Sequence, residues 1–94
     1  MMKGLALEVE LIIQESFSLK DKRRVLKSIL DKSQAKYNVA AAEVSEQEIL
    51  NRAVLAFSSV SNQYGQCERV LRSVIHLIDD QYQVEIVRIV WTEF

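Results

Sequence analysis

Hydrophobic and polar residues alternate along residues 4–13. One side of an extended chain would carry Leu5, Leu7, Val9, Leu11 and Ile13, and the other would carry Gly4, Ala6, Glu8 and Glu10. A period of two is typical of a strand with one face buried in a core. The pattern therefore predicts a first strand over 4–13.

A helix of about 18 residues is predicted next. Ser18 can act as its N-cap, and Asp21 follows three residues later, as in a capping box with a shorter acid. At 100° per residue, one side of this helix holds Leu19, Leu26, Ile29, Leu30, Ser33 and Tyr37. This apolar stripe would dock the helix on a sheet.

The remaining elements follow the same reasoning. We expect strands at 38–44, 52–60 and 84–91, and a helical turn within the polar loop 45–51. A second helix is expected over 63–79, capped by Ser61 or Asn62, with a turn at 79–83. Its predicted core positions are Val70, Leu71, Val74, Leu77 and Ile78.

The predicted order is βαββαβ, from which we expect one α+β domain spanning residues 1–94. Two interlocked right-handed βαβ crossovers give a ferredoxin-like sandwich. Its four-stranded antiparallel sheet has the order 4-1-3-2, with two helices on one face. Such a fold hosts many unrelated functions, so the function must be argued from particular residues.

Composition indicates a soluble cytoplasmic protein. No apolar stretch is long enough to span a bilayer, and Glu8 and Glu10 interrupt the apolar start of the chain, unlike a signal peptide. A single cysteine, Cys67, excludes an intramolecular disulfide and suits a reducing compartment. The net charge of −1 means that any nucleic-acid affinity must come from a local basic patch.

Several short motifs stand out along the chain: Glu15-Ser16, Ser18-Leu19-Lys20, Lys22-Arg23, Asn38-Val39 and Ala42-Glu43-Val44. In these motifs the sequence resembles the YlxP-like family of small bacterial proteins. The resemblance covers nearly the whole chain and implies a ferredoxin-like fold. Genes of this uncharacterised family often lie near those for translation initiation and ribosome maturation factors, so the resemblance also implies association with RNA or the ribosome. It implies no catalytic residues, because none are known for the family.

Basic residues are concentrated in the first predicted helix. Residues 20–36 hold seven basic residues and two aspartates, a net charge of +5. Lys20, Arg23, Arg24 and Lys27 lie within about 100° of arc and would form one ridge, while Lys22 falls on the other side of the apolar stripe and would extend over the core edge. We expect this ridge to bind nucleic acid; the alternative is an ordinary solvated helix face.

The sheet face away from the helices is a second candidate surface. The outward positions Ala6, Glu8 and Glu10 offer no aromatic platform, so stacking of bases as in RNA-recognition motifs is not expected. Phe57 is expected in the core, with Val54 and Ala56 facing outward beside Ser58 and either Val90 or Trp91. The alternative function is therefore a homo-oligomeric ligand-binding or regulatory domain that uses this face, with a homodimer as the expected assembly.

Other candidate residues give weaker signals. His76 is the only histidine, which argues against a zinc site, and Cys67 matches the apolar spacing of the second helix, which favours a packed thiol. Glu43 could pair with Arg52 across a hairpin, or act as a general base in an enzyme of unfamiliar type. We find no catalytic constellation, metal-ligand set, cofactor-binding motif, membrane-binding segment or motif that reads DNA sequence, and expect a non-enzymatic protein.

Overall fold

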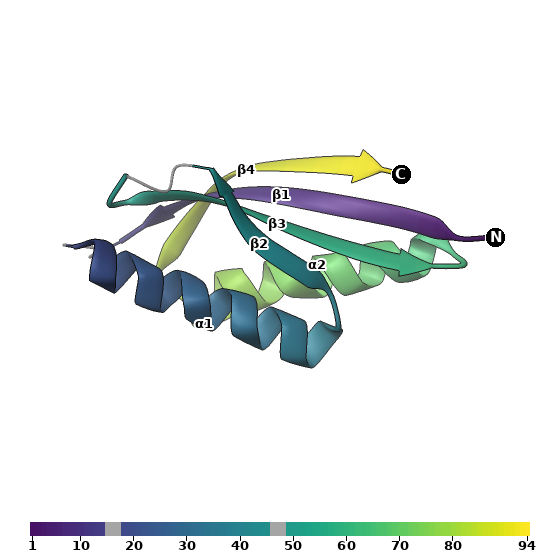
Figure 1. Cartoon of the computed structure of the whole chain (residues 1–94), viewed down its shortest axis with the longest axis horizontal. Coiled ribbons are helices and arrows are strands. Elements are labelled where there is room, and N and C mark those ends of the chain that lie inside the picture. Colours follow the sequence, from purple (N-terminus) through teal and green to yellow (C-terminus); the bar gives the residue numbers. More distant parts are fainter. Residues whose placement is uncertain (15–17, 46–48) are drawn as a thin grey trace.

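The computed structural model describes residues 1–14, 18–45 and 49–94, and its elements follow the predicted order (Figure 1). They are β1 (Lys3–Ile13), α1 (Leu19–Tyr37), β2 (Ala40–Ser45), β3 (Arg52–Ser61), α2 (Tyr64–Gln81) and β4 (Val84–Glu93). The predicted helical turn at 45–51 falls partly on residues 46–48, outside the described residues.

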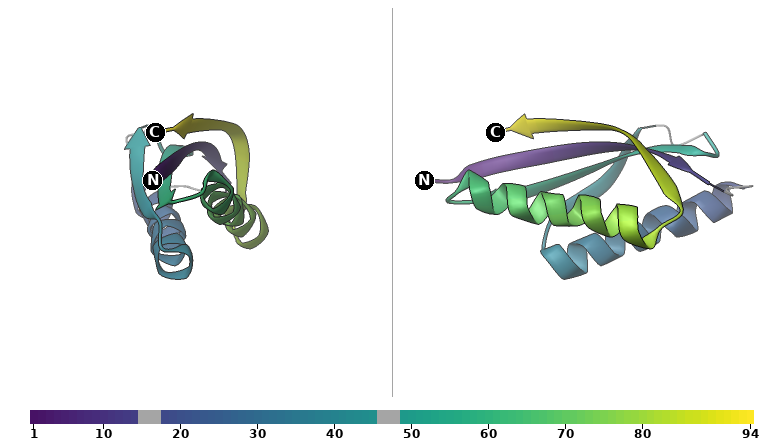
Figure 2. Two further views of the ribbon diagram at one scale, coloured as in Figure 1. Left: turned by 90° about the vertical axis from the view of Figure 1, so that its right-hand side faces the viewer. Right: turned by 180° about the vertical axis from the view of Figure 1, so that it is seen from behind.

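The strands form a four-stranded antiparallel sheet within these described ranges. Its order is β2-β3-β1-β4, which is the predicted order read from the other edge. Both helices lie against one face of the sheet, and the other face has no helix over it (Figure 2). The α+β ferredoxin-like arrangement is thereby confirmed. None of the helices in the described ranges is long and apolar enough to cross a membrane.

The core lies between the sheet and the two helices. All five alternating apolar residues of β1 are buried in it, together with Ala53, Leu55 and Phe57 of β3. From the helices come Leu26, Ile29, Cys67, Leu71, Val74 and Ile78. Burial of these side chains supplies the main driving force for docking the helices.

The residues at the ends of the elements explain why some observed boundaries differ from the predicted ones. The Oγ of Ser18 accepts a hydrogen bond of 3.1 Å from the backbone N–H of Asp21, as predicted for the N-cap of α1. Asn38 has a positive φ of 54° and closes the helix with its N–H on the carbonyl of Gln34. Because Asn38 serves as this C-cap, β2 begins at Ala40 instead of residue 38.

Helix α2 begins one residue later and ends two residues later than the predicted range 63–79, and its predicted N-cap was wrong. Its N-cap is Gln63, not Ser61 or Asn62, and the Gln63 side chain makes no capping hydrogen bond. The Ser61 Oγ instead accepts from the Gln63 N–H at 3.3 Å, in the turn that precedes the helix. At the other end, Asp79 and Asp80 are helical and exposed, because the buried pair Leu77 and Ile78 anchors the last turn of α2 to the core.

Both edge strands carry an irregularity at the same level of the sheet. The register of β4 shifts between Glu10 and Leu11, which leaves Val87 as an extra residue. The register of β2 shifts between Glu43 and Ser45, which leaves Val44 as an extra residue. Val54 of β3 pairs with Glu10 of β1 at this level, so one row across the sheet contains both bulges.

Candidate nucleic-acid interface

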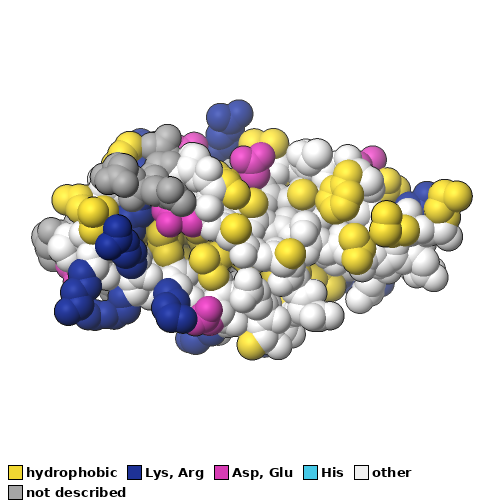
Figure 3. All heavy atoms as spheres, in the orientation of Figure 1, with side chains coloured by type: hydrophobic (Ala, Val, Ile, Leu, Met, Phe, Trp, Pro, Cys, Tyr) yellow, Lys and Arg dark blue, Asp and Glu magenta, His cyan; other side chains and the backbone are white. Residues whose placement is uncertain are grey.

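The basic ridge lies along the first half of α1, on the side of the helix away from the sheet. Lys20, Arg23, Arg24 and Lys27 are all exposed, and Figure 3 shows basic side chains gathered over this end of the molecule. Lys27 contacts Asp31 at 2.7 Å, and both of these side chains are solvent-exposed. Within the described ranges, Lys20, Arg23 and Arg24 form no ion pair, so their charges are not neutralised by the rest of the described chain.

The docking of α1 determines which way the ridge faces. Leu26 and Ile29 are buried on the sheet side of the helix, and Ser33 is fully buried with them. Leu30 and Tyr37 pack partly buried against the same core. Since residues three and four apart share a helix face, burying this stripe leaves the ridge residues pointing to solvent.

Lys22 was predicted to extend over the core edge, but it is 1 % exposed. Its Nζ donates a hydrogen bond of 2.6 Å to the backbone carbonyl of Ile49 and lies 3.6 Å from Oε2 of Glu43. Lys22 therefore joins α1 to β2 and to the residues preceding β3. It is a structural residue and adds nothing to the exposed positive charge of the ridge.

The predicted pair between Glu43 and Arg52 is wrong. Glu43 pairs in register with the buried Leu55, so alternation turns its side chain toward the helices, where it meets Lys22. Arg52 faces the opposite side of the sheet, and its guanidinium contacts Oε2 of Glu10 at 2.7 Å. Glu43 and Arg52 thus do not share a site.

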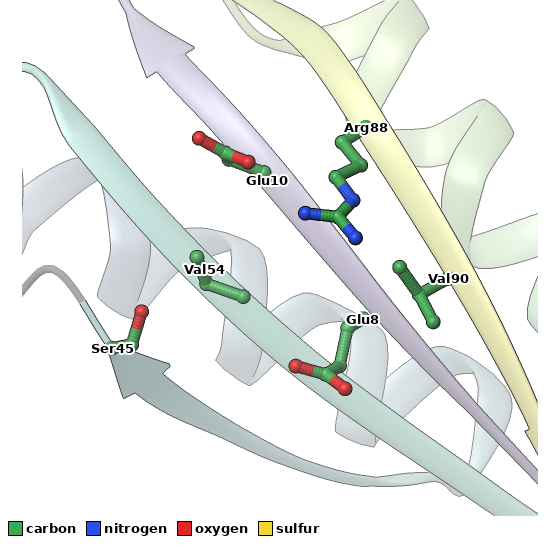
Figure 4. Close-up of a pocket in the computed structure, with 6 residues that line it drawn as sticks. All are labelled: Glu8, Glu10, Ser45, Val54, Arg88 and Val90. Carbon is green, nitrogen blue, oxygen red and sulfur yellow. The ribbon is translucent and has the colours of Figure 1, made fainter.

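The open sheet face contains a shallow hollow with charges of both signs. It is lined by Glu8, Glu10, Ser45, Val54, Arg88 and Val90. In Figure 4 the Arg88 side chain reaches over β1 between the two glutamates. Farther along the face, small residues prevail: Ala6, Ala40, Ala42, Ala56 and Ser58 surround a second, mainly apolar depression.

The residues of β3 and β4 that were predicted to lie on the open sheet face are found there. Val54, Ala56 and Ser58 are half-buried on β3 while Phe57 is in the core. The residue that β4 adds to the open face is Val90, which pairs with Glu8. Trp91 pairs with the core residue Leu7 and faces the helices, where the Arg72 guanidinium lies 5.2 Å from the centroid of the indole ring.

The two remaining single residues, Cys67 and His76, both lie on α2. Cys67 is fully buried, and its Sγ lies 3.9 Å from the carbonyl oxygen of Lys3, so it is a packed thiol. His76 is exposed on α2. Among the described residues, no group of three or more His, Cys, Asp or Glu side chains could hold a metal ion.

A third depression adjoins the basic ridge and was not predicted. It has a volume of about 310 Å³ and is lined by Gln14, Asp21, Arg24, Val25, Gln81, Tyr82 and Gln83. These residues come from the end of β1, the first turns of α1 and the connection between α2 and β4. Sequence periodicity could not reveal the depression, since it depends on how three separate elements meet.

The fold and these sites define a small α+β domain with an exposed basic helix, and comparison with known proteins identifies its family. Residues 5–91 match the family described as protein of unknown function, DUF503, and the chain belongs to this family. It is also similar to the uncharacterized protein YlxP of Bacillus subtilis (strain 168), with 38 % identity over 78 residues. This match covers 83 % of the chain and 85 % of that relative, and it confirms the YlxP-like resemblance.

Proposed function

We propose that this protein is a small non-enzymatic module that binds RNA, free or in the ribosome, through the ridge on α1. The observation that carries the proposal is the exposure of Lys20, Arg23, Arg24 and Lys27 on one side of a helix whose other side is fixed in the core. From Lys20 to Lys27 the ridge extends about 10 Å along the helix. That length is enough to contact several phosphates of one strand.

Charge distribution supports a local polyanion contact. The chain as a whole carries −1, so the four exposed basic residues of the ridge lie on a protein that is otherwise acidic. Only Lys27 of the four ridge residues has an ion-pair partner within the described ranges, and that exposed pair is worth at most about 1 kcal/mol. Phosphates can therefore replace the aspartate at little energetic cost.

The open sheet face is less suited to RNA. The outward residues of β1 and β3 are mostly small, aliphatic or acidic. The basic residue among them, Arg52, is held by Glu10 at 2.7 Å, and the carboxylate of Glu8 repels phosphates. Phe94 packs its ring over Gly4 at the margin of this face, where an added Cβ would approach the ring to within 2.5 Å. The helix, not the sheet, is thus the proposed contact.

A charge-reversal experiment tests the proposal. Arg23→Glu/Lys27→Glu should abolish binding of ribosomal RNA fragments in a fluorescence titration at low salt. The matched control is Lys3→Glu/Arg69→Glu, which changes the net charge equally at the other end of the molecule. If both double variants bind as tightly as the wild type, or if the wild type binds no RNA, the proposal fails.

A second candidate function, self-association through the open sheet face, is favoured by the mixture of residues on that face. Small apolar side chains such as Ala6, Ala42 and Ala56 form one part of it, and Glu8 and Arg88 lie in the other. Neither Glu8 nor Arg88 forms an ion pair within the described residues. In a two-fold symmetric dimer, a patch with both charges can be complementary to itself. Sedimentation at micromolar concentration tests this candidate, and a single 10.8 kDa species would contradict it.

A further inference from the structure

The depression beside the ridge shares Arg24 with it. Arg24 belongs to the exposed basic ridge and also lines the hollow between α1, the end of β1 and the α2–β4 connection. Figures 1 and 2 show the start of α1 close to the place where α2 ends and β4 begins. A strand whose phosphates follow the ridge would therefore pass the mouth of this hollow.

The hollow combines an aromatic residue with polar groups. Tyr82 is half-buried, and its hydroxyl is 2.7 Å from that of Ser28 on α1. The ammonium of Lys32 lies 5.5 Å from the centroid of the Tyr82 ring. These two contacts from α1 hold the ring in place, so little ordering is needed when a ligand arrives.

Three glutamines supply hydrogen-bonding groups to the same hollow. Gln14, Gln81 and Gln83 line it and are exposed. The Oε1 of Gln81 accepts a hydrogen bond of 3.4 Å from Nζ of Lys32, so the NH₂ group of this carboxamide is what faces a ligand as donor. The carboxamides of Gln14 and Gln83 offer both donors and an acceptor, which is the combination that the edge of an unpaired base presents in return. The backbone N–H of Gln14 donates to the carbonyl of Gln83 at 3.2 Å, which fixes the spacing of the two residues.

We infer that this hollow binds one unpaired nucleobase of the RNA strand held by the ridge. The inference rests on the proposed function and adds that the preferred substrate is single-stranded. A volume of about 310 Å³ lies at the lower end of the range for small-ligand sites, which suits a single base. Bases that are not paired can leave the stack and enter such a pocket, whereas those of a duplex cannot do so without first unpairing.

Another aromatic hollow on the molecule fits a base less well. It is lined by Leu5, Tyr64, Glu68, Arg72, Trp91 and Glu93. The Arg72 guanidinium already lies over the Trp91 ring and contacts Glu68 at 2.9 Å. The carboxylates of Glu68 and Glu93 in this hollow would repel a phosphate backbone, and the hollow includes no residue of the ridge.

The test compares a labelled single-stranded oligonucleotide with a duplex of the same length at one salt concentration. Gln81→Ala/Gln83→Ala should weaken single-strand binding about tenfold, because two hydrogen bonds to the base are lost. Its duplex affinity should equal that of the wild type. The control Gln63→Ala/Gln66→Ala, at the opposite end of α2 about 22 Å away, should change neither affinity.

The outcomes separate this inference from the proposed function. If Arg23→Glu/Lys27→Glu abolishes binding while the glutamine double variant keeps the wild-type preference for single strands, only the base pocket is overturned. Equal binding of single strand and duplex by the wild type overturns it as well. If the wild type binds neither the single strand nor the duplex, both proposals fail together.

A competition with mononucleotides shows whether the hollow binds a base of an RNA strand or the base of a free nucleotide. Adenosine and guanosine monophosphates are titrated against the bound oligonucleotide. Weak competition, far below that of unlabelled oligonucleotide, is expected, because a mononucleotide gains only one phosphate contact. Competition as strong as that of the oligonucleotide would assign the hollow to free nucleotides and overturn the assignment to an RNA strand.

Discussion

Lys22 and Glu43 face each other beneath the surface, with Nζ of the lysine 3.6 Å from Oε2 of the glutamate. The lysine side chain is 2 % exposed and that of the glutamate 21 %. Removing charges from water is costly, and here the cost is offset by mutual attraction and by the 2.6 Å hydrogen bond to the Ile49 carbonyl. The pair fixes the position of the basic helix relative to the sheet.

Replacing Lys22 alone should therefore destabilise the protein. Lys22→Met keeps the apolar stem but leaves the carboxylate of Glu43 and the Ile49 carbonyl without the ammonium. We expect the free energy of unfolding to fall by about 2–4 kcal/mol, measured by urea denaturation. The double variant Lys22→Met/Glu43→Leu should recover much of this loss, and a single variant as stable as the wild type would contradict the structural role.

The two helices should respond differently to removal of their N-terminal side chains. Ser18→Ala removes the hydroxyl that accepts from Asp21, and should cost about 1 kcal/mol of folding stability. Asn62→Ala should change stability by less than about 0.5 kcal/mol, because the N-cap of α2 is Gln63. Thermal unfolding of the two variants compares them directly, and equal losses would be inconsistent with these cap positions.

The salt dependence of RNA affinity should report how many phosphates the ridge contacts. If four phosphates are neutralised, the affinity for a single strand should fall with a log–log slope of about 3. Arg23→Ala should lower that slope by about 1, because one contact is lost. Titrations at four or more salt concentrations measure the slope. An unchanged slope for Arg23→Ala would place Arg23 outside the interface.

Self-association through the sheet face should depend on Arg88. Arg88→Glu places a third carboxylate next to Glu8 and Glu10, and should raise the dimer dissociation constant about tenfold or more. Analytical ultracentrifugation over a concentration series measures this change. Arg69→Glu on the helix side carries the same charge change and serves as the control; an equal effect of both variants would argue against the sheet face.

Local patterns were sufficient to predict the fold. The alternation from Leu5 to Ile13 identified both the strand and its buried face, and the stripe of Leu26 and Ile29 identified the inner side of α1. These patterns are informative because the burial or exposure of each side chain depends on the periodicity of its own element. Predicted boundaries failed where one residue ended an element for geometric reasons, as Asn38 does with its positive φ.

The contacts between elements could not be predicted in the same way. Lys22 reads as one more basic residue of the helix, and only the folded chain shows that it reaches a carbonyl 27 residues downstream. The pairing of Arg52 with Glu10, instead of Glu43, depends on which face each side chain occupies in the assembled sheet. The hollow around Tyr82 depends on three elements meeting. The exposed ridge, in contrast, needed only the helical wheel.

The paired bulges of β2 and β4 have a consequence for solubility. Edge strands of open sheets tend to recruit further strands and so to aggregate, and a bulge interrupts the regular row of backbone groups needed for this. Val44 and Val87 interrupt both edges at one level of the sheet. Neither edge therefore offers an uninterrupted template for another strand. The chain should remain dispersed at concentrations where a regular four-stranded sheet of this length would begin to form fibrils.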